Sequence, residues 1–308
     1  MRRGFVFGVA GVLLVGLICP AFVCGEEKPP KIKVVATLFP FADWAGQIGG
    51  EYVEVISLLK PGASPHTYEL TTKDVKAIRD AKLLIVNGSG LDDWVGKLVE
   101  RSANKGIVKL AMSGHLPLAP MPMMVTEESG KGKHQEDDDA KTGCGMWLDP
   151  MRAVRMVDLI AEALCQVDPE HKAYYQEQAK RYWGQLDRLD RMYRSKLGGL
   201  KGGVIAFHAD LIYLFRRYGI EVYGVVEPYP GKEPSVDYIR KLTNLVSGKP
   251  LLFVLTEAQL SEKPAQVLAN QLKVRAVMID PIGGTGLPGR DSYISLMTYN
   301  LNKMVSRQ

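Results

Sequence analysis

Two kinds of segment alternate along the chain, and they differ in how apolar and polar positions are spaced. Short apolar runs bounded by turn residues are typical of buried strands, whereas apolar residues recurring every three or four positions indicate one face of a helix. The predicted strands are 31–36, 53–59, 83–87, 107–111, 203–207, 221–226, 251–255 and 275–279. The predicted helices are 41–49, 71–81, 91–102, 152–166, 168–198, 209–218, 236–246 and 263–272. This alternation predicts an α/β fold with parallel sheets.

The order of these elements occurs twice, once in 31–111 and again in 203–279. We therefore expect two similar lobes, each a parallel sheet with flanking helices. Right-handed crossovers place the strand-to-helix loops of each lobe at the carboxyl edge of its sheet, where ligands of such folds bind. Two lobes with facing edges would enclose a cleft.

The predicted helix 168–198 is much longer than the others and stands between the two repeats. Asp168 is suited to its N-cap, Pro169 to its first position and Gly198 to its end. Its apolar residues follow one another in steps of three and four, which predicts a single buried stripe. The stripe consists of Tyr175, Ala179, Tyr182, Leu186, Leu189 and Tyr193. We interpret this segment as one long rigid helix that joins the lobes.

The N-terminus has the pattern of a secretory signal. Arg2 and Arg3 precede an apolar run, and small residues follow near Gly25, as in a cleaved signal peptide. A large residue precedes each of Cys19 and Cys24, which disfavours a lipoprotein and favours a periplasmic product. The expected domains are a signal peptide (1–25), an N-terminal lobe (26–167), the linking helix (168–198) and a C-terminal lobe (199–308).

Charge and composition exclude several classes of function. The formal net charge is +5 without a basic stripe, which argues against a nucleic-acid partner. The segment 121–145 is acidic and poor in apolar residues from Glu127 onward, so we expect a mobile loop. The chain contains no phosphate-binding loop, no serine-hydrolase elbow, no HExxH and no CxxC.

Three candidate metal donors directly follow predicted strands or their loops. His66 lies in PGASPHTYEL after strand 53–59, where Pro65 restrains the backbone, while His208 and Asp280 each follow a strand of the second repeat. Two imidazoles and a carboxylate suit zinc or manganese. Each residue also has an ordinary interpretation, as a surface histidine, a histidine at a helix start and a turn-forming aspartate.

These segments carry a resemblance to a known family. PGASPHTYEL, WLDP, AFHADLIYLFRRYGIE, LTEAQLSEKPAQVLANQL and IDPIGG resemble, in order, the solute-binding receptors of zinc and manganese ABC importers. The resemblance implies a monomeric binding protein, not an enzyme, that captures a divalent metal between its lobes and delivers it to a membrane permease. It implies His66, His208 and Asp280 as ligands. His208, where manganese receptors usually have Glu, favours Zn²⁺ over Mn²⁺.

One family ligand is missing. The family has a second histidine two residues before the Trp of its WLDP-like motif, and this position is Gly145 here. Three hypotheses remain open: Cys144 supplies a thiolate, water or His134 completes a weaker site, or the receptor has lost tight metal binding or has a different ligand. Cys144 could instead form a disulfide with Cys165, although the position of Cys165 late on helix 152–166 disfavours it.

Two other functions remain as alternatives. A zinc-dependent hydrolase could use the same three ligands, an open coordination position and Glu257 as its base. An adhesin or scaffold could keep the fold of a metal receptor without tight binding. Hydrolysis by the metal-loaded protein, or metal-dependent binding to a permease, would separate these functions.

Overall fold

The computed structural model describes residues 1, 4, 30–118, 145–229 and 231–306. Contacts divide the chain into Met1–Pro30 and Lys31–Gln308, and the second unit holds all the elements described below. Most of the predicted signal peptide, and the predicted acidic loop apart from Gly145, lie outside the described residues. Among the residues described, no helix has both the length and the apolar character needed to cross a membrane.

The strands form two parallel sheets with the same topology. The first has the order β2-β1-β3-β4 and the second β6-β5-β7-β8. Their bounds are β1 (Ile32–Ala36), β2 (Val53–Ser57), β3 (Leu83–Val86), β4 (Val108–Ala111), β5 (Gly203–Ala206), β6 (Glu221–Val225), β7 (Leu251–Glu257) and β8 (Ala276–Ile279). In both sheets the first strand in sequence lies between the second and the third, so the chain reverses direction across the sheet there. The predicted fold of two similar α/β lobes is confirmed.

Nine helices surround these sheets within the described part of the chain. They are α1 (Phe39–Gly49), α2 (Thr72–Arg79), α3 (Trp94–Ser102), α4 (Pro150–Val167), α5 (Lys172–Leu197), α6 (Ile212–Arg217), α7 (Val236–Val246), α8 (Lys263–Leu272) and α9 (Tyr293–Val305). The predicted helices are present, some with shorter ends. Helix α9 was not predicted.

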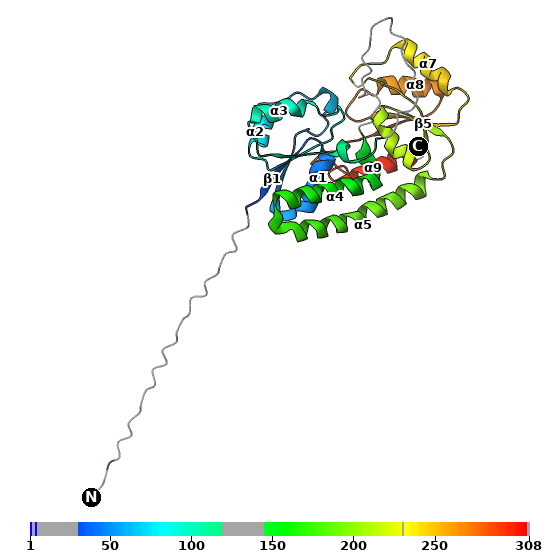
Figure 1. The fold of residues 1–308 in the computed structure, drawn as a ribbon. Coiled ribbons are helices and arrows are strands. Elements are labelled where there is room, and N and C mark those ends of the chain that lie inside the picture. Colours follow the sequence, from blue (N-terminus) through cyan, green and yellow to red (C-terminus); the bar gives the residue numbers. More distant parts are fainter. Residues whose placement is uncertain (2–3, 5–29, 119–144, 230, 307–308) are drawn as a thin grey trace. The chain divides into compact units, whose positions relative to one another are not determined.

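Alternation along the central strands builds three hydrophobic clusters. Val34 of β1 faces an inner cluster while Val35 faces an outer one against α2 and α3. In β5, Val204 faces the same inner cluster and Ile205 an outer one against α7 and α8. Helices α1, α4, α5 and α9 lie together on the inner side (Figure 1). The inner cluster is therefore one core shared by both lobes.

Helix α5 is the predicted linking helix. Its predicted stripe is buried along its whole length, and it packs against α4, α1 and α9. It begins four residues later than expected, because Pro169–His171 form a 3₁₀ turn in which Asp168 accepts hydrogen bonds from His171 and Tyr175. The shared core makes α5 one of several elements that connect the lobes, and α4 runs beside it (Figure 1).

A chain of buried and partly buried hydrogen bonds joins the segment before α4 to the second lobe. The indole Nε1 of Trp147 donates to the carbonyl of Pro281 at 2.7 Å. The hydroxyl of Tyr293 donates to the carbonyl of Trp147 at 2.6 Å, and the backbone N–H of Tyr293 donates to Asp43 of α1 at 2.9 Å. These bonds fix the segment that begins at Gly145 against the loops at the carboxyl edge of the second sheet.

Candidate metal site

His208 lies at the centre of a buried, charged cluster in the second lobe. It follows β5 directly, Glu257 ends the neighbouring strand β7, and Glu227 follows β6 on the other side. Its Nδ1 lies 3.2 Å from Oε1 of Glu257, and its Nε2 lies 3.5 Å from Oε2 of Glu227. All three side chains are almost completely buried. Three adjacent strands thus deliver these groups to one edge, as the topology requires.

The two carboxylates control the charge of His208. Burial alone would lower the pKa of the imidazole, but the charge of Glu257 and the contacts of the ring with the carboxylates of Glu227 and Glu257 outweigh it and raise the pKa to about 10. His208 is therefore an imidazolium at neutral pH when no metal is bound. Its buried Nε2 makes no hydrogen bond and faces Oε2 of Glu227 at 3.5 Å.

His66 reaches the same place from the first lobe. It lies on the 3₁₀ turn Pro65–Thr67, which is fixed by a hydrogen bond from its backbone N–H to Oγ of Ser64 at 3.3 Å. The ring centroids of His66 and His208 are 5.3 Å apart. His66 is exposed at the surface, unlike His208, but desolvation of its ring and then the nearby charge of His208 lower its pKa to about 4. The structure thus brings together one neutral and one charged imidazole.

Asp280, the third predicted donor, is held by other groups. Its Oδ1 accepts hydrogen bonds from Gln259 at 2.6 Å and from two backbone N–H groups of the following turn. Its Oδ2 accepts one hydrogen bond, from Arg290 at 2.9 Å. Asn300 bonds both backbone groups of Asp280. Oδ2 retains a free lone pair, since a carboxylate oxygen can accept two bonds, and the role of Asp280 as a ligand stays a prediction.

A different carboxylate lies nearer to His208. Within the described residues, one group of metal-binding side chains has its donor atoms all within 4.8 Å of one another, namely His208, Asp210 and Glu257. Oδ1 of Asp210 is buried without a hydrogen-bond partner. Burial, and then the charge of Glu257, raise the pKa of Asp210 to about 7.

Asp210 and Glu227 were not predicted as site residues. Glu227 directly follows a predicted strand, and this is the same signal that identified His208. Asp210 gives no comparable signal, because its position two residues after His208 resembles the polar start of a helix.

The two residues predicted to replace the missing histidine, Cys144 and His134, lie outside the described residues. Cys165 is a free thiol, partly exposed, with Sγ 3.7 Å from the carbonyl of Lys172. At Gly145, a Cβ atom would lie 2.8 Å from the carbonyl carbon of Asp210 and closer still to its oxygen. Any side chain at this position would therefore require Asp210 to move.

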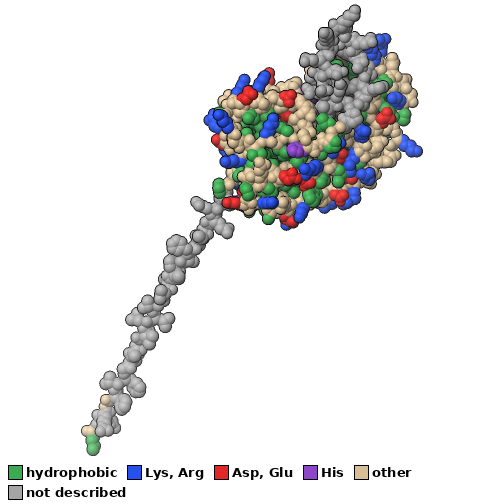
Figure 2. Space-filling view, viewed as in Figure 1, with side chains coloured by type: hydrophobic (Ala, Val, Ile, Leu, Met, Phe, Trp, Pro, Cys, Tyr) green, Lys and Arg blue, Asp and Glu red, His purple; other side chains and the backbone are tan. Residues whose placement is uncertain are grey.

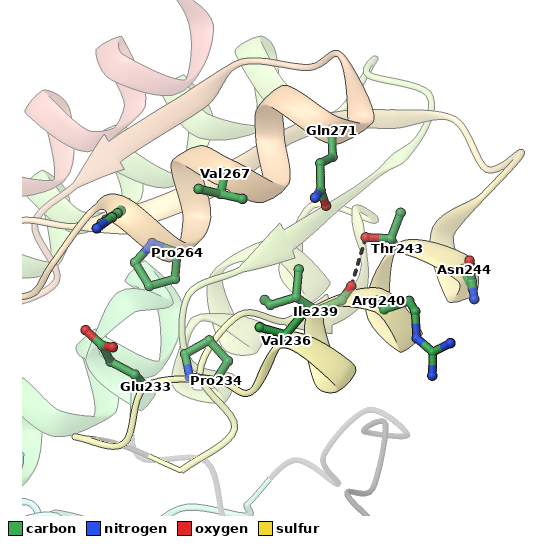
Figure 3. Close-up of a pocket in the computed structure, with 11 residues that line it drawn as sticks. Glu233, Pro234, Val236, Ile239, Arg240, Thr243, Asn244, Pro264, Val267 and Gln271 are labelled. Atoms are coloured by element: carbon green, nitrogen blue, oxygen red, sulfur yellow. Dashed lines mark hydrogen bonds between the residues drawn. The ribbon is translucent and has the colours of Figure 1, made fainter.

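A separate groove lies on the outer side of the second lobe. It has a volume of about 780 Å³ and lies between α7 and α8. Figure 3 shows Val236, Ile239 and Val267 along it, with Glu233 at one end. Its lining contains one carboxylate and no histidine, so it offers no metal-donor set.

On the face seen in Figure 2, acidic and basic side chains are interspersed.

Comparisons with known proteins agree with this geometry. The profile of the family described as zinc-uptake complex component A, periplasmic, matches residues 34–307. The zinc-binding lipoprotein AdcA of Streptococcus pneumoniae is 27% identical over 301 residues, and the match covers 95% of this chain and 60% of AdcA. A putative metal-binding protein of Treponema pallidum is 26% identical, with 98% of this chain and 96% of that protein covered.

A solved structure shows the same fold. The solute-binding protein FpvC of Pseudomonas aeruginosa in complex with Mn²⁺ superposes with a TM-score of 0.76 at 24% identity, covering 89% of this chain and 97% of that one. The chain therefore spans most of the length of the structural relative, but about 60% of the length of AdcA.

Proposed function

The chain belongs to the family of periplasmic zinc-uptake component A proteins, and from this premise we propose that it captures Zn²⁺ outside the cytoplasm and delivers it to the permease of an ABC importer. The observation that carries the proposal is the meeting of His66 from one lobe with His208 from the other, 5.3 Å apart between ring centroids. A metal bound by both imidazoles would hold the two lobes together.

The charge of the site supports a divalent cation as the ligand. Among the described residues, Glu227 and Glu257 make their ion pairs with the single imidazole of His208, and Asp210 lies beside them. Two glutamates and a partly ionised Asp210 around one imidazolium leave an excess of negative charge, which is costly in a medium of low polarity. A divalent cation would remove this excess.

The proposed donors differ in their protonation state before metal binds. His66 is neutral above pH 5, because its pKa is about 4, so its ring nitrogen is available. His208 first gives up a proton, after which its Nε2 can bind metal while Glu257 fixes the ring through Nδ1, as carboxylates do for zinc-bound histidines. Asp280 would contribute the free lone pair of Oδ2. Imidazoles with carboxylates suit zinc and also accept manganese.

The further parts of the proposal concern the form of the protein. We propose a monomer, released into the periplasm by cleavage near Gly25. Binding and release would be its whole chemistry. The rival zinc-hydrolase hypothesis needs Glu257 as a free base, but its Oε1 lies 3.2 Å from Nδ1 of His208, a position that serves to orient the imidazole.

A metal titration tests the proposal. Protein freed of metal is titrated with Zn²⁺ and with Mn²⁺ against a chromophoric chelator, and the variants His66→Ala and His208→Ala are compared with His115→Ala. His115 is exposed and lies at the end of another 3₁₀ turn, at Met112–His115, so it serves as a matched control. We expect one tight Zn²⁺ site that is lost in the first two variants and kept in the control. Equal affinity in all three variants would overturn the proposal.

A further inference from the structure

The space next to Gly145 is filled by the backbone and Cβ of Asp210. A Cβ at Gly145 would lie 2.8 Å from the carbonyl carbon of Asp210 and closer still to its carbonyl oxygen, and both distances are shorter than real Cβ contacts. The Cβ of Asp210 would lie 3.0 Å away, a tight contact. Gly145 has φ −78°, so no special backbone conformation calls for glycine here. The glycine is explained by the close approach of Asp210 alone.

This approach brings a carboxylate into the cluster. Asp210 lies on the 3₁₀ turn Ala209–Leu211, which follows His208. Its carboxylate, the imidazole of His208 and the carboxylate of Glu257 have donor atoms within 4.8 Å of one another. The segment that begins at Gly145 is held against the same edge by Trp147, through the bond of its indole to Pro281.

Two buried atoms in this cluster lack a hydrogen bond. Oδ1 of Asp210 is one of them. Nε2 of His208 is the other, and it faces Oε2 of Glu227 in an ion pair at 3.5 Å. A buried carboxylate oxygen without a hydrogen bond is costly when no ligand is present. A metal ion would satisfy both at once, because each is a donor that zinc and manganese accept.

We propose that Asp210 supplies the metal donor that the glycine at position 145 cannot supply, so that the site binds its metal through His66, His208, Asp280 and Asp210. This inference rests on the proposed function and specifies its donor set. The set has two nitrogen and two oxygen donors, where a histidine at position 145 would give three nitrogens. An added carboxylate makes the site harder, so it discriminates less strongly between Zn²⁺ and Mn²⁺.

The first test is X-ray absorption spectroscopy of the wild-type protein loaded with Zn²⁺. We expect two imidazoles and additional oxygen donors in the first shell. A sulfur scatterer at about 2.3 Å would identify Cys144 as the donor, and a third imidazole would identify His134. Either result would overturn the role of Asp210 while leaving the capture of zinc in place. If the wild-type protein takes up no metal, the proposed function itself fails.

The second test compares Asp210→Asn with Asp237→Asn, an exposed residue in the first turn of α7. We expect Asp210→Asn to weaken Zn²⁺ binding at least about tenfold and to change the visible spectrum of the Co²⁺-loaded protein. Asp237→Asn should change neither, and thermal unfolding of the metal-free proteins reports whether each variant is folded. A folded Asp210→Asn protein with wild-type affinity and an unchanged cobalt spectrum would overturn the inference.

A third variant, Gly145→His, tests directly whether Asp210 takes the place of a histidine at position 145. If position 145 had merely lost its histidine, Gly145→His would tighten zinc binding. Because the new side chain would displace Asp210, we expect weaker binding and a lower unfolding temperature. Tighter binding in a stable Gly145→His protein would contradict the proposal.

Discussion

Metal binding by His208 should release one proton in the neutral range. The pKa of His208 is raised to about 10 in the metal-free protein, whereas a metal ion needs the neutral ring. Each Zn²⁺ that binds must therefore displace the proton that Glu227 and Glu257 stabilise. His66 releases none above pH 5, because its pKa is about 4.

The size of the effect follows from these values. Well below pH 10, displacing one proton makes the apparent affinity rise about tenfold for each pH unit, or roughly 1.4 kcal/mol. From pH 7.5 to 8.5 we therefore expect the Kd for Zn²⁺ to fall about tenfold. The pKa of Asp210 is raised to about 7, so a second proton is displaced in more acidic solution. From pH 5.5 to 6.5 the Kd should then fall by about a hundredfold.

Two measurements give the number of protons. Chelator competition across the pH range, corrected for protonation of the chelator, yields the slope of log Kd. Calorimetric titration in two buffers of different ionisation enthalpy yields the protons released at one pH. An unchanged Kd between pH 7.5 and 8.5 would refute the imidazolium form of His208 or its role as a ligand. Asp210→Asn is the internal control, because it should remove the second proton below pH 7 and keep the first.

Further predictions concern stability. The folded pKa of His208, about 10, exceeds its ordinary 6.5. The stabilisation from this shift, on the order of 5 kcal/mol, is therefore complete below pH 6.5 and is lost towards pH 10. Calorimetry of the metal-free protein should show a Tm that falls over this range. Gly145→Ala should cost about 1–3 kcal/mol in urea unfolding, because its Cβ meets Asp210, whereas Gly46→Ala, with open space in α1, should gain up to about 1 kcal/mol. Tyr293→Phe leaves a buried carbonyl unpaired and should cost about 1–3 kcal/mol. An equal effect of the two glycine substitutions, or a neutral Tyr293→Phe, would contradict the packing described.

Most of the fold was predictable because strands and helices are specified by the spacing of apolar residues within each segment. A central strand such as β1 alternates between two apolar faces, and a run of this kind can be identified without knowing its partners. Helix α9 was missed although its apolar residues have helical spacing. Its start lies after a long segment rich in glycine and proline, and its cap is formed by two serines, Ser292 and Ser295, instead of the more recognisable pairing with Glu or Gln.

Helix boundaries depended on contacts that are distant in sequence. The predicted helix 91–102 begins only at Trp94, because Asp92 turns its carboxylate back to accept hydrogen bonds from Thr37 and from the backbone of Asn87 and Gly88. Thr37 follows β1, 55 residues away. The spacing of residues near Asp92 does not indicate that Thr37 is its hydrogen-bond partner.

Only those site residues that lie at the carboxyl ends of strands, or in the loops after them, could be predicted from the sequence. His66 and His208 were identified by their position at carboxyl edges, and the structure places their rings together. Asp280 obeys the same rule, yet its nearest partners are Gln259 and Arg290. The rule assigns residues to an edge and does not tell which side chains on that edge face one another.

The glycine at position 145 shows why a missing motif residue is an incomplete observation. From the motif alone, Gly145 means that a donor is lost, and the predicted replacements were Cys144, water or His134. In the structure, the space that a side chain would need is held by Asp210, 65 residues further along the chain. The absence of a histidine at position 145 and the presence of the Asp210 carboxylate in the site are therefore two results of the same packing. Pairing Gly145→His with Asp210→Asn should therefore give strongly non-additive effects on zinc affinity, because contacting residues couple; additive effects would separate the two positions.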